Sequence, residues 1–359
     1  MTTNNNAIPM DQAINLAFNV CVNTKRHPFL IGPSGCGKTA MVSNELRSKL
    51  AEHEGMTVGD GEGEFKLWFI DAATTDGAEL RGLPSIDSET KLSSWATPDS
   101  LPQEGEKGLI LIDEPNTAID KSFLFALYQL LGNDRRIGDW KLPTGVYIAL
   151  CGNRMEDAVG LEEIPAPLRS RCWMTEVRPE VNSWVRYGLE NKFDIRIIAS
   201  ARAYPEFITE WDGEADEQCA NARAMEDCSD ALKGWEASGG ASHDLMNLFS
   251  GFIGRDAAMK VATVVRNFDD MIPVSVIVES PQDAPLPKTI DMELSLMCAL
   301  AKCADEDNLE AIVEYVERVR LVGSSQESSA LFRNVLLSEV EKEGNTAQNS
   351  DAFDQFVRR

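Results

Sequence analysis

Residues 32 to 39 read G-P-S-G-C-G-K-T, and this spacing of glycine, lysine and threonine is the pattern of a phosphate-binding loop. Glycines let backbone N–H groups approach a phosphate, because no Cβ stands in the way. In such a loop Lys38 reaches the β- and γ-phosphates of a nucleoside triphosphate, and Thr39 holds Mg²⁺. We therefore expect ATP and Mg²⁺ as ligands. The expected phosphate contacts are Gly32, Pro33, Ser34, Gly35, Cys36, Gly37, Lys38, Thr39 and Ala40.

The sequence on either side of the loop supports this interpretation. Residues 28–31 are apolar and predict a buried strand, and residues 38–52 follow with a helical pattern. The amino end of that helix would add about half a positive charge next to a phosphate. The alternative is a tight strand-to-helix connection without a ligand. Cys36 is either a small tolerated residue or a redox-active thiol.

A carboxylate pair follows the apolar residues 108–113 and resembles a Walker B element. Asp113 would hold the hydration shell of Mg²⁺, and Glu114 would act as the general base that polarises a water molecule. The alternative is that the pair only caps a helix.

Three further polar residues follow predicted strands or helices of the first half. Asn153 comes after the strand predicted at 147–151 and would orient water near the γ-phosphate, unless it only forms a turn. Arg171, with Arg169 as the second choice, would reach the site of a neighbouring subunit and stabilise transferred charge. Surface ion pairing is the alternative for both arginines.

The order of the predicted elements indicates an α/β P-loop core followed by a helical region. Parallel strands are expected at 28–31, 67–71, 108–113, 147–151 and 173–177, and core helices at 9–22, 38–52 and 121–131. Helices are expected at 181–190, 194–210, 217–234, 243–268, 291–303, 307–320 and 326–343, with a proline-rich break near 272–287 and a loose tail after 343. We expect a nucleotide-binding core at 1–178, a helical lid at 179–322, and a C-terminal helix and flexible tail at 323–359.

Composition narrows the class of protein. The chain has 359 residues and a formal charge of −24, which disfavours broad binding to a nucleic-acid backbone. No signal peptide or membrane span is recognisable, and eight scattered cysteines look like reduced core residues, so we expect a cytoplasmic protein. Three histidines without clustered cysteines give no zinc pattern.

The motifs together resemble those of MoxR-type AAA+ ATPases of the helix-2-insert group. They are GPSGCGKT, DGAELRGLP, SSWATPDSLP, LILIDEPNTA, ALYQLLGNDRRIGDWKLP, ALCGNR and PAPLRSRC, over residues 8–178. The resemblance implies a three-layer core with sheet order 5-1-4-3-2, a helical lid and a homo-oligomeric, usually hexameric ring. It also implies a von Willebrand A-type partner and chaperone-like remodelling. In the lid, Arg223 matches the arginine that touches the γ-phosphate, although Ala222 replaces the usual proline.

Two loops bear on partners. Residues 82–102 would be the insert, where Leu83 and Trp95 either contact a client protein or pack on the core. Residues 132–143 read as a hairpin with Arg135, Arg136, Trp140 and Lys141, and these residues contact either the next subunit or nucleic acid.

The leading hypothesis is an ATP-hydrolysing ring that remodels a protein. One alternative is a motor that acts on nucleic acid, and another is a nucleotide-gated scaffold with slow hydrolysis. The intact Lys38, Asp113, Glu114 and Arg171 argue against the scaffold.

Overall fold

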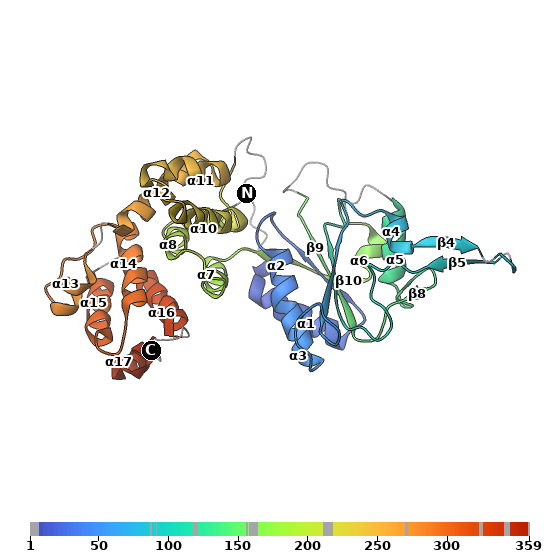
Figure 1. Ribbon diagram of the computed structural model, residues 1–359, viewed down its shortest axis with the longest axis horizontal. Coiled ribbons are helices and arrows are strands. Elements are labelled where there is room, and N and C mark those ends of the chain that lie inside the picture. The colour runs from blue at the N-terminus through green and yellow to red at the C-terminus, as the bar shows by residue number, and fades with distance from the viewer. Residues whose placement is uncertain are drawn as a thin grey trace. The chain divides into compact units, whose positions relative to one another are not determined.

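The computed structural model describes residues 7–86, 88–90, 92–117, 121–155, 157, 164–210, 218–269, 272–322, 326–340 and 345–357. It forms two compact units, Met1–Pro179 and Glu180–Arg359 (Figure 1). The first is an α/β unit and the second is helical.

A parallel sheet forms the centre of the first unit. Its strands are β1 (Ile8–Pro9), β2 (His27–Ile31), β3 (Lys66–Asp71), β6 (Gly108–Asp113), β9 (Val146–Gly152) and β10 (Cys172–Arg178). Their spatial order is β1-β10-β2-β9-β6-β3, and every pair is parallel. The five longer strands, numbered along the chain, therefore have the expected order 5-1-4-3-2, and the α/β P-loop fold is confirmed. The two-residue β1 was not predicted, because it is too short to show a periodic pattern.

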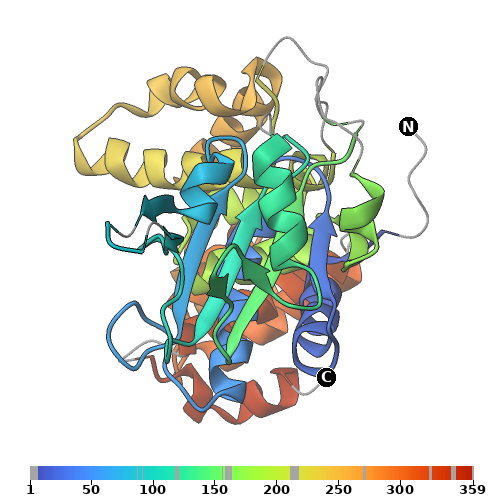
Figure 2. The same cartoon turned by 90° about the vertical axis from the view of Figure 1, so that its right-hand side faces the viewer.

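Helices cover both faces of this sheet (Figure 2). Successive strand residues point to opposite faces, so Leu109 and Leu111 join one apolar core and Ile110 and Ile112 the other. The first core contains α1 (Met10–Asn23) and the helix after the loop; the second contains α4 (Gly77–Arg81), α5 (Lys121–Leu130) and α6 (Ala166–Arg169). Both faces are buried, which explains the continuous apolar runs of the strands.

The helix that follows the phosphate loop is not uniform. It begins as α2 (Lys38–Met41), widens into a π-helical turn (Val42–Leu46) and continues as α3 (Arg47–His53). The Ser43 hydroxyl donates to the Thr39 carbonyl at 2.7 Å inside this segment. Helical residues extend through the predicted span 38–52, and the π turn is the feature that the sequence pattern missed.

The first unit also contains two antiparallel hairpins. One pairs β4 (Leu83–Ile86) with β5 (Ser93–Ala96), and its Leu83 side chain is 70% exposed. The half-buried Trp95 lies 5.7 Å from the Arg81 guanidinium.

The other hairpin pairs β7 (Arg136–Ile137) with β8 (Trp140–Lys141), as the sequence predicted. Trp140 is buried and its Nε1 donates to the Pro102 carbonyl at 2.9 Å. The ring of Trp140 is therefore part of the core, and contact of this hairpin with the next subunit or with nucleic acid stays a prediction.

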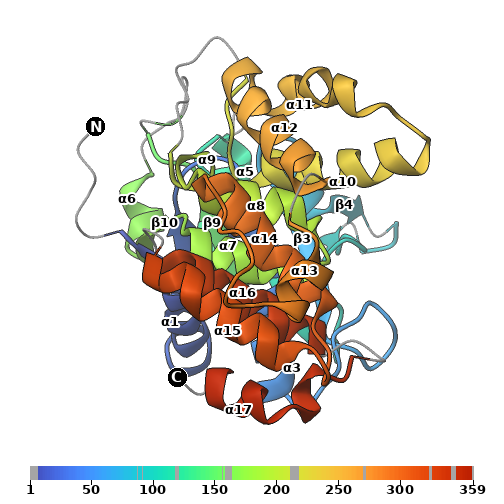
Figure 3. The same cartoon turned by 90° about the vertical axis from the view of Figure 1, so that its left-hand side faces the viewer.

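The second unit consists of helices around its own apolar core (Figure 3). They are α7 (Val181–Glu190), α8 (Ile195–Ala203), α9 (Glu206–Thr209), α10 (Ala222–Ala237), α11 (Leu245–Ile253), α12 (Arg255–Asp269), α13 (Val274–Glu279), α14 (Ile290–Cys303), α15 (Leu309–Val322), α16 (Gln326–Val340) and α17 (Asp351–Val357). Short 3₁₀ turns lie at Ser242–Asp244 and Ala347–Asn349.

The structure corrects four predictions for this unit. Pro205 separates α8 from α9, and Gly254, with φ of 75°, separates α11 from α12, so two long predicted helices are each divided. The proline-rich break contains α13. Residues 345–357 of the C-terminal tail are not loose, because Phe356 of α17 is buried and its ring centroid lies 5.4 Å from that of Phe332. Helices α16 and α17 lie within the second compact unit, Glu180–Arg359.

Within the described ranges, no helix combines the length and the apolar character needed to cross a bilayer. All eight cysteines are free thiols.

Candidate nucleotide-binding site

The phosphate loop lies at the carboxyl end of β2 and depends on backbone conformations that favour glycine. Gly35 and Gly37 have φ of 71° and 91°, in the left-handed region that side chains disfavour. Gly32 lies against the neighbouring strand: a Cβ there would come within 2.7 Å of Val177 Cγ2. The loop is tied to β9 by the Gly32 N–H, which donates to the Gly152 carbonyl at 3.2 Å.

Lys38 is the central cation of the loop. Its side chain is buried, although a lysine ammonium is rarely buried without partners. Nζ donates to the carbonyls of Gly32 at 2.9 Å and Pro33 at 2.7 Å, and to Asn153 Oδ1 at 3.2 Å. These bonds hold the ammonium inside the curve of the loop, where a phosphate would meet it.

Thr39 and Asp113 come together from two neighbouring elements. The Thr39 hydroxyl donates to Asp113 Oδ2 at 2.9 Å. Burial raises the pKa of the Asp113 carboxyl and the adjacent Glu114 charge adds to this, whereas the Thr39 hydrogen bond and Lys38 oppose it. A hydroxyl beside a partly desolvated carboxylate is an oxygen pair suited to a divalent cation.

Glu114 has a strained backbone at the end of β6. Its φ is 52°, which is uncommon for a residue with a long side chain and is found at functional sites. The conformation is held by the Glu114 N–H, which donates to the Cys151 carbonyl at 2.8 Å. The Glu114 carbonyl in turn accepts from the Thr117 hydroxyl at 2.7 Å. The strain turns the carboxylate toward the end of β9.

Asn153 connects the cation and the carboxylate. Its Oδ1 accepts from Lys38, and its Nδ2 donates to Glu114 Oε1 at 2.7 Å. One buried carboxamide therefore fixes the distance between the loop lysine and the candidate base. Asn153 therefore does more than form a turn, and its role in orienting water near the γ-phosphate stays a prediction.

Two residues of this site were not singled out from the sequence. Asn116 is buried, and its Nδ2 donates to the Asn153 carbonyl at 3.0 Å, while its Oδ1 has no hydrogen-bond partner in the described part of the chain. Asp71 ends β3 and is paired in register with Asp113. Both residues have a sequence signal: Asn116 follows the carboxylate pair, and Asp71 ends an apolar strand. Their place in the site, however, depends on the order of the strands in the sheet.

Within the described residues, Arg169 and Arg171 of the first unit make no hydrogen bond or ion pair with this network, and Arg223 belongs to the second unit. Arg171 precedes β10, and its Nη1 donates to the Pro167 carbonyl at 2.6 Å; Arg169 is exposed at the end of α6. Arg223 is exposed in the first turn of α10, in the second unit, where Asn221 caps the helix. The structure therefore brings Lys38, Thr39, Asp113, Glu114 and Asn153 together, and the roles of the three arginines remain predictions.

The thiol inside the loop has no sign of activation. Burial raises the pKa of Cys36, and the nearby Lys38 only partly offsets this effect. A raised pKa leaves the group as a neutral thiol, which is a poor nucleophile. The interpretation of Cys36 as a small tolerated residue is the one that its surroundings favour.

The described residues contain no cluster of three or more His, Cys, Asp or Glu side chains that could enclose a metal ion. Mg²⁺ fits the site nevertheless, because it usually takes one or two protein oxygens and completes its shell with phosphate oxygens and water. Thr39 and Asp113 would supply those protein oxygens.

Comparison with known proteins finds similarity to solved structures only. No family model and no curated protein matches the chain. Among solved structures, the chain is similar to NtrX from Brucella abortus in complex with ATP, with 15% identity over 92% of this chain and 67% of that one and a TM-score of 0.39. It is also similar to a mutant of RuvB from Thermotoga maritima, with 14% identity over 91% of this chain and 86% of that one and a TM-score of 0.37.

Proposed function

We propose that this protein is an AAA+ ATPase that hydrolyses ATP with Mg²⁺ at the carboxyl ends of β2, β6 and β9. One observation carries the proposal: Lys38, Asn153 and Glu114 form a continuous hydrogen-bonded chain beside the Thr39–Asp113 pair. The sheet order places these residues together, and the glycine loop provides backbone donors for phosphates.

Each residue has a distinct task in this proposal. Lys38 binds the β- and γ-phosphates, and Thr39 and Asp113 orient the cation. Mg²⁺, when bound, neutralises charge that develops on the phosphate oxygens. Glu114 accepts the proton of the attacking water through Oε1 or Oε2, and Asn153 holds that carboxylate in place. Arg171 and Arg223 are proposed to act on the γ-phosphate, Arg171 from a neighbouring subunit.

At a finer level, we propose a MoxR-like role. The chain would form a homo-oligomer, with a hexameric ring as the expected form, and would remodel a protein that carries a von Willebrand A-type domain. Support comes from the order of the sequence motifs and from the β4–β5 hairpin, which lies where the helix-2 insert is expected and exposes Leu83. Neither a nucleic-acid motor nor a slow scaffold has comparable support. The buried Trp140 removes the aromatic part of the case for nucleic acid.

The test compares the wild-type chain with Glu114→Gln. The amide keeps the shape of the side chain but cannot accept a proton, so we expect ATP binding to be retained while turnover falls by about 10²–10⁴. Binding is measured by titration with a labelled ATP analogue and turnover by phosphate release. A matched control is Glu79→Gln, at an exposed position of α4. Normal turnover in Glu114→Gln would reduce Glu114 to a capping residue and would remove the proposed mechanism.

A further inference from the structure

The peptide group that joins Asn153 to Arg154 is held by two side chains. It lies just beyond Gly152, where the ladder between β2 and β9 ends. The Asn153 carbonyl accepts from Asn116 Nδ2 at 3.0 Å, and the Arg154 N–H donates to Asp157 Oδ2 at 3.2 Å. Both of these side chains belong to buried residues, since Asn116 is 4% exposed and Asp157 is 6% exposed. One peptide group therefore has both of its polar atoms bonded to buried side chains.

The Arg154 guanidinium keeps the Asp157 carboxylate in place. Nε donates to Oδ2 at 2.8 Å and Nη2 donates to Oδ1 at 2.6 Å, a paired geometry that a lysine cannot reproduce. The backbone closes the same turn, because the Asp157 N–H donates to the Arg154 carbonyl at 3.0 Å. A buried carboxylate is costly without such partners. The carboxylate is therefore presented to the peptide group in one orientation.

The same guanidinium connects this turn to the strand on the other side of β2. Arg154 Nη1 lies 3.5 Å from Glu176 Oε1 on β10, and Glu176 is paired in register with Ile31, the last residue of β2. Strand β2 lies between β10 and β9, so the Arg154 side chain crosses the end of β2 where the phosphate loop begins. Burial is the main cause of the raised pKa of Cys36, to which Asp157 adds and which Arg154 opposes. Both charges therefore lie close to the loop.

Glycine at position 152 leaves room for Asn116. A Cβ on Gly152 would come within 2.8 Å of the Phe29 ring and 3.0 Å of Asn116 Oδ1. Asn116 therefore packs directly against the backbone that leads into Asn153. It comes two residues after Glu114, so the segment that carries the candidate base also supports Asn153.

We propose that Asn116, Arg154 and Asp157, which we call the peptide clamp, are positioning residues of the ATPase reaction. They fix the backbone from which the Asn153 carboxamide extends. That carboxamide makes two hydrogen bonds at once, to the loop lysine and to the candidate base, and rotation of its backbone would draw it away from one of them. The inference rests on the proposed function, because the task of the clamp is to hold a residue of that site.

The first variants change one side of the clamp at a time. Arg154→Lys keeps the positive charge but loses the paired geometry, and Asn116→Ala loses the bond to the Asn153 carbonyl. We expect each variant to lower kcat by about tenfold, with the affinity for a labelled ATP analogue within about twofold of wild type. The control is Arg320→Lys, because Arg320 pairs with Glu317 at the same spacing in α15, with 2.6 Å between the charged groups.

A double-mutant cycle separates positioning from structural support. If the clamp acts through Asn153, then Arg154→Lys and Asn116→Ala change kcat by less than about twofold when Asn153→Ala is already present, because the carboxamide that they hold is gone. A clamp that only stabilises the unit lowers kcat by the same factor in both backgrounds. Equal factors would overturn the proposal, and so would a normal kcat in both single variants.

A second measurement does not depend on turnover. Removing Arg154 alone would leave a buried carboxylate without its partner, so Arg154→Gln/Asp157→Ala removes both charges together. Hydrogen exchange by mass spectrometry over residues 150–155 should become at least about tenfold faster in this variant, because the Arg154 N–H loses its acceptor. The control, Glu317→Ala/Arg320→Gln, should leave exchange in this segment unchanged.

The measurements separate failure of the clamp from failure of the proposed function. A wild-type chain without turnover would overturn the proposed function. Turnover with equal factors in the cycle would overturn the positioning role alone, and unchanged exchange would overturn the clamp whatever the turnover.

Discussion

The two ends of strand β2 carry positive charge in different ways. At the carboxyl end, Lys38 is 6% exposed and is bonded to two loop carbonyls and to Asn153, with Asp113 and Glu114 close by. At the amino end, Lys25 and Arg26 are exposed and have no carboxylate partner in the described structure. The first end is a closed network, and the second is an open cluster.

This difference bears on how each end would work. Buried groups that satisfy one another hold their geometry before a ligand arrives, and such pre-organisation is what a catalytic site requires. Exposed cations around an opening instead gain most from an anion that comes from outside. We expect substitutions at the closed network to alter binding and chemistry within one chain, and substitutions at the open cluster to act through another molecule.

Arg171→Ala gives the largest expected effect and tests whether this arginine, which lines the same pocket as Lys25 and Arg26, acts on another chain. An arginine supplied in trans stabilises transition-state charge, so we expect turnover to fall by about 10³–10⁵ with ATP affinity largely retained. Phosphate release and nucleotide titration measure the two quantities. Arg169→Ala, at the exposed neighbouring arginine, is the matched comparison.

Mixed assemblies decide whether that loss occurs between chains. Arg171→Ala and Glu114→Gln chains, each inactive alone, should regain activity together, because some interfaces then pair an intact Arg171 with an intact Glu114. Failure to regain activity in confirmed mixed assemblies would place Arg171 outside any shared site and would make the two ends of β2 independent.

Lys38→Ala should break the closed network at its centre. The substitution removes the ammonium that faces the phosphates, and charge-assisted bonds of this kind are worth about 1.5–3 kcal/mol each. We expect ATP affinity to fall by about 10²-fold or more, measured by fluorescence titration. Lys25→Ala should leave that affinity unchanged, and equal losses in both variants would contradict the distinction between the two ends of β2.

The sequence was sufficient for the architecture of the first unit. Its buried strands are continuous apolar runs bounded by polar residues, and that pattern survives in any fold that covers both faces of a parallel sheet. The sequence was less informative about the helices of the second unit. Pro205 and Gly254 divide helices whose apolar periods continue across the break, so periodicity alone joined α8 to α9 and α11 to α12.

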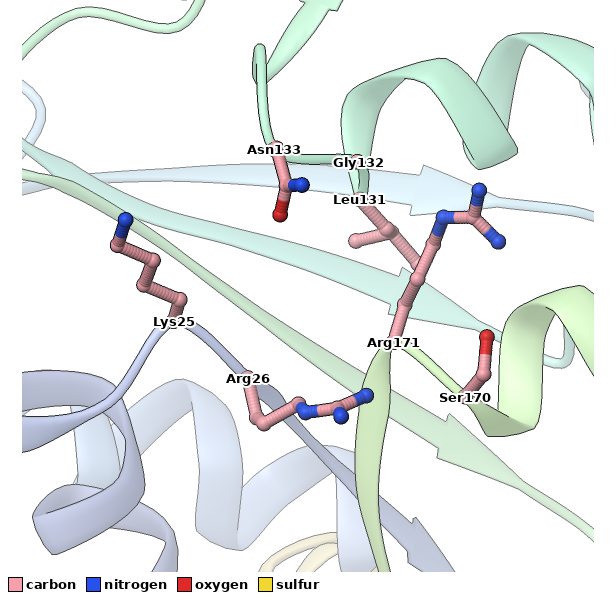
Figure 4. Close-up of a pocket in the computed structure, with 7 residues that line it drawn as sticks. All are labelled: Lys25, Arg26, Leu131, Gly132, Asn133, Ser170 and Arg171. Atoms are coloured by element: carbon pink, nitrogen blue, oxygen red, sulfur yellow. The ribbon is translucent and has the colours of Figure 1, made fainter.

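The candidate site shows the same limit. Motif spacing identified Lys38, Asp113 and Glu114, since their order along the chain follows from the loop and the strand ends. The bridge from Lys38 through Asn153 to Glu114 depends on strand order and on the positive φ of Glu114, which no local pattern specifies. A pocket at the amino end of β2 is lined by Lys25, Asn133 and Arg171 among others, and no local pattern predicts it because these residues come from segments that are distant in sequence (Figure 4).

Asn153→Ala tests whether the closed network is more than a set of separate residues. The variant keeps Lys38 and Glu114 but removes the carboxamide between them, so we expect turnover to fall roughly 10–100-fold, as for residues that orient catalytic groups. Steady-state kinetics should show the loss mainly in kcat. The control is Asn247→Ala, at an exposed position of α11. An unchanged kcat in Asn153→Ala would mean that Glu114 does not need the hydrogen bond from Asn153.

His27 gives the smallest expected effect and reports on its burial at the amino end of β2, to which the charges of Arg135 and Arg26 add. Its folded pKa of about 3 lies below the ordinary value of 6.5, so the folded chain binds fewer protons than the unfolded chain between these values. The stability that neutral His27 contributes is therefore complete above pH 6.5 and is lost as pH falls toward 3. We expect His27→Gln to reduce the slope of unfolding free energy against pH by up to about 1.4 kcal/mol per pH unit in this window. Urea unfolding from pH 6.5 to 4.5 measures the slope, and His243→Gln is the control because that side chain is 81% exposed. Equal slopes for wild type and His27→Gln would show that burial and the nearby Arg135 and Arg26 do not keep His27 neutral.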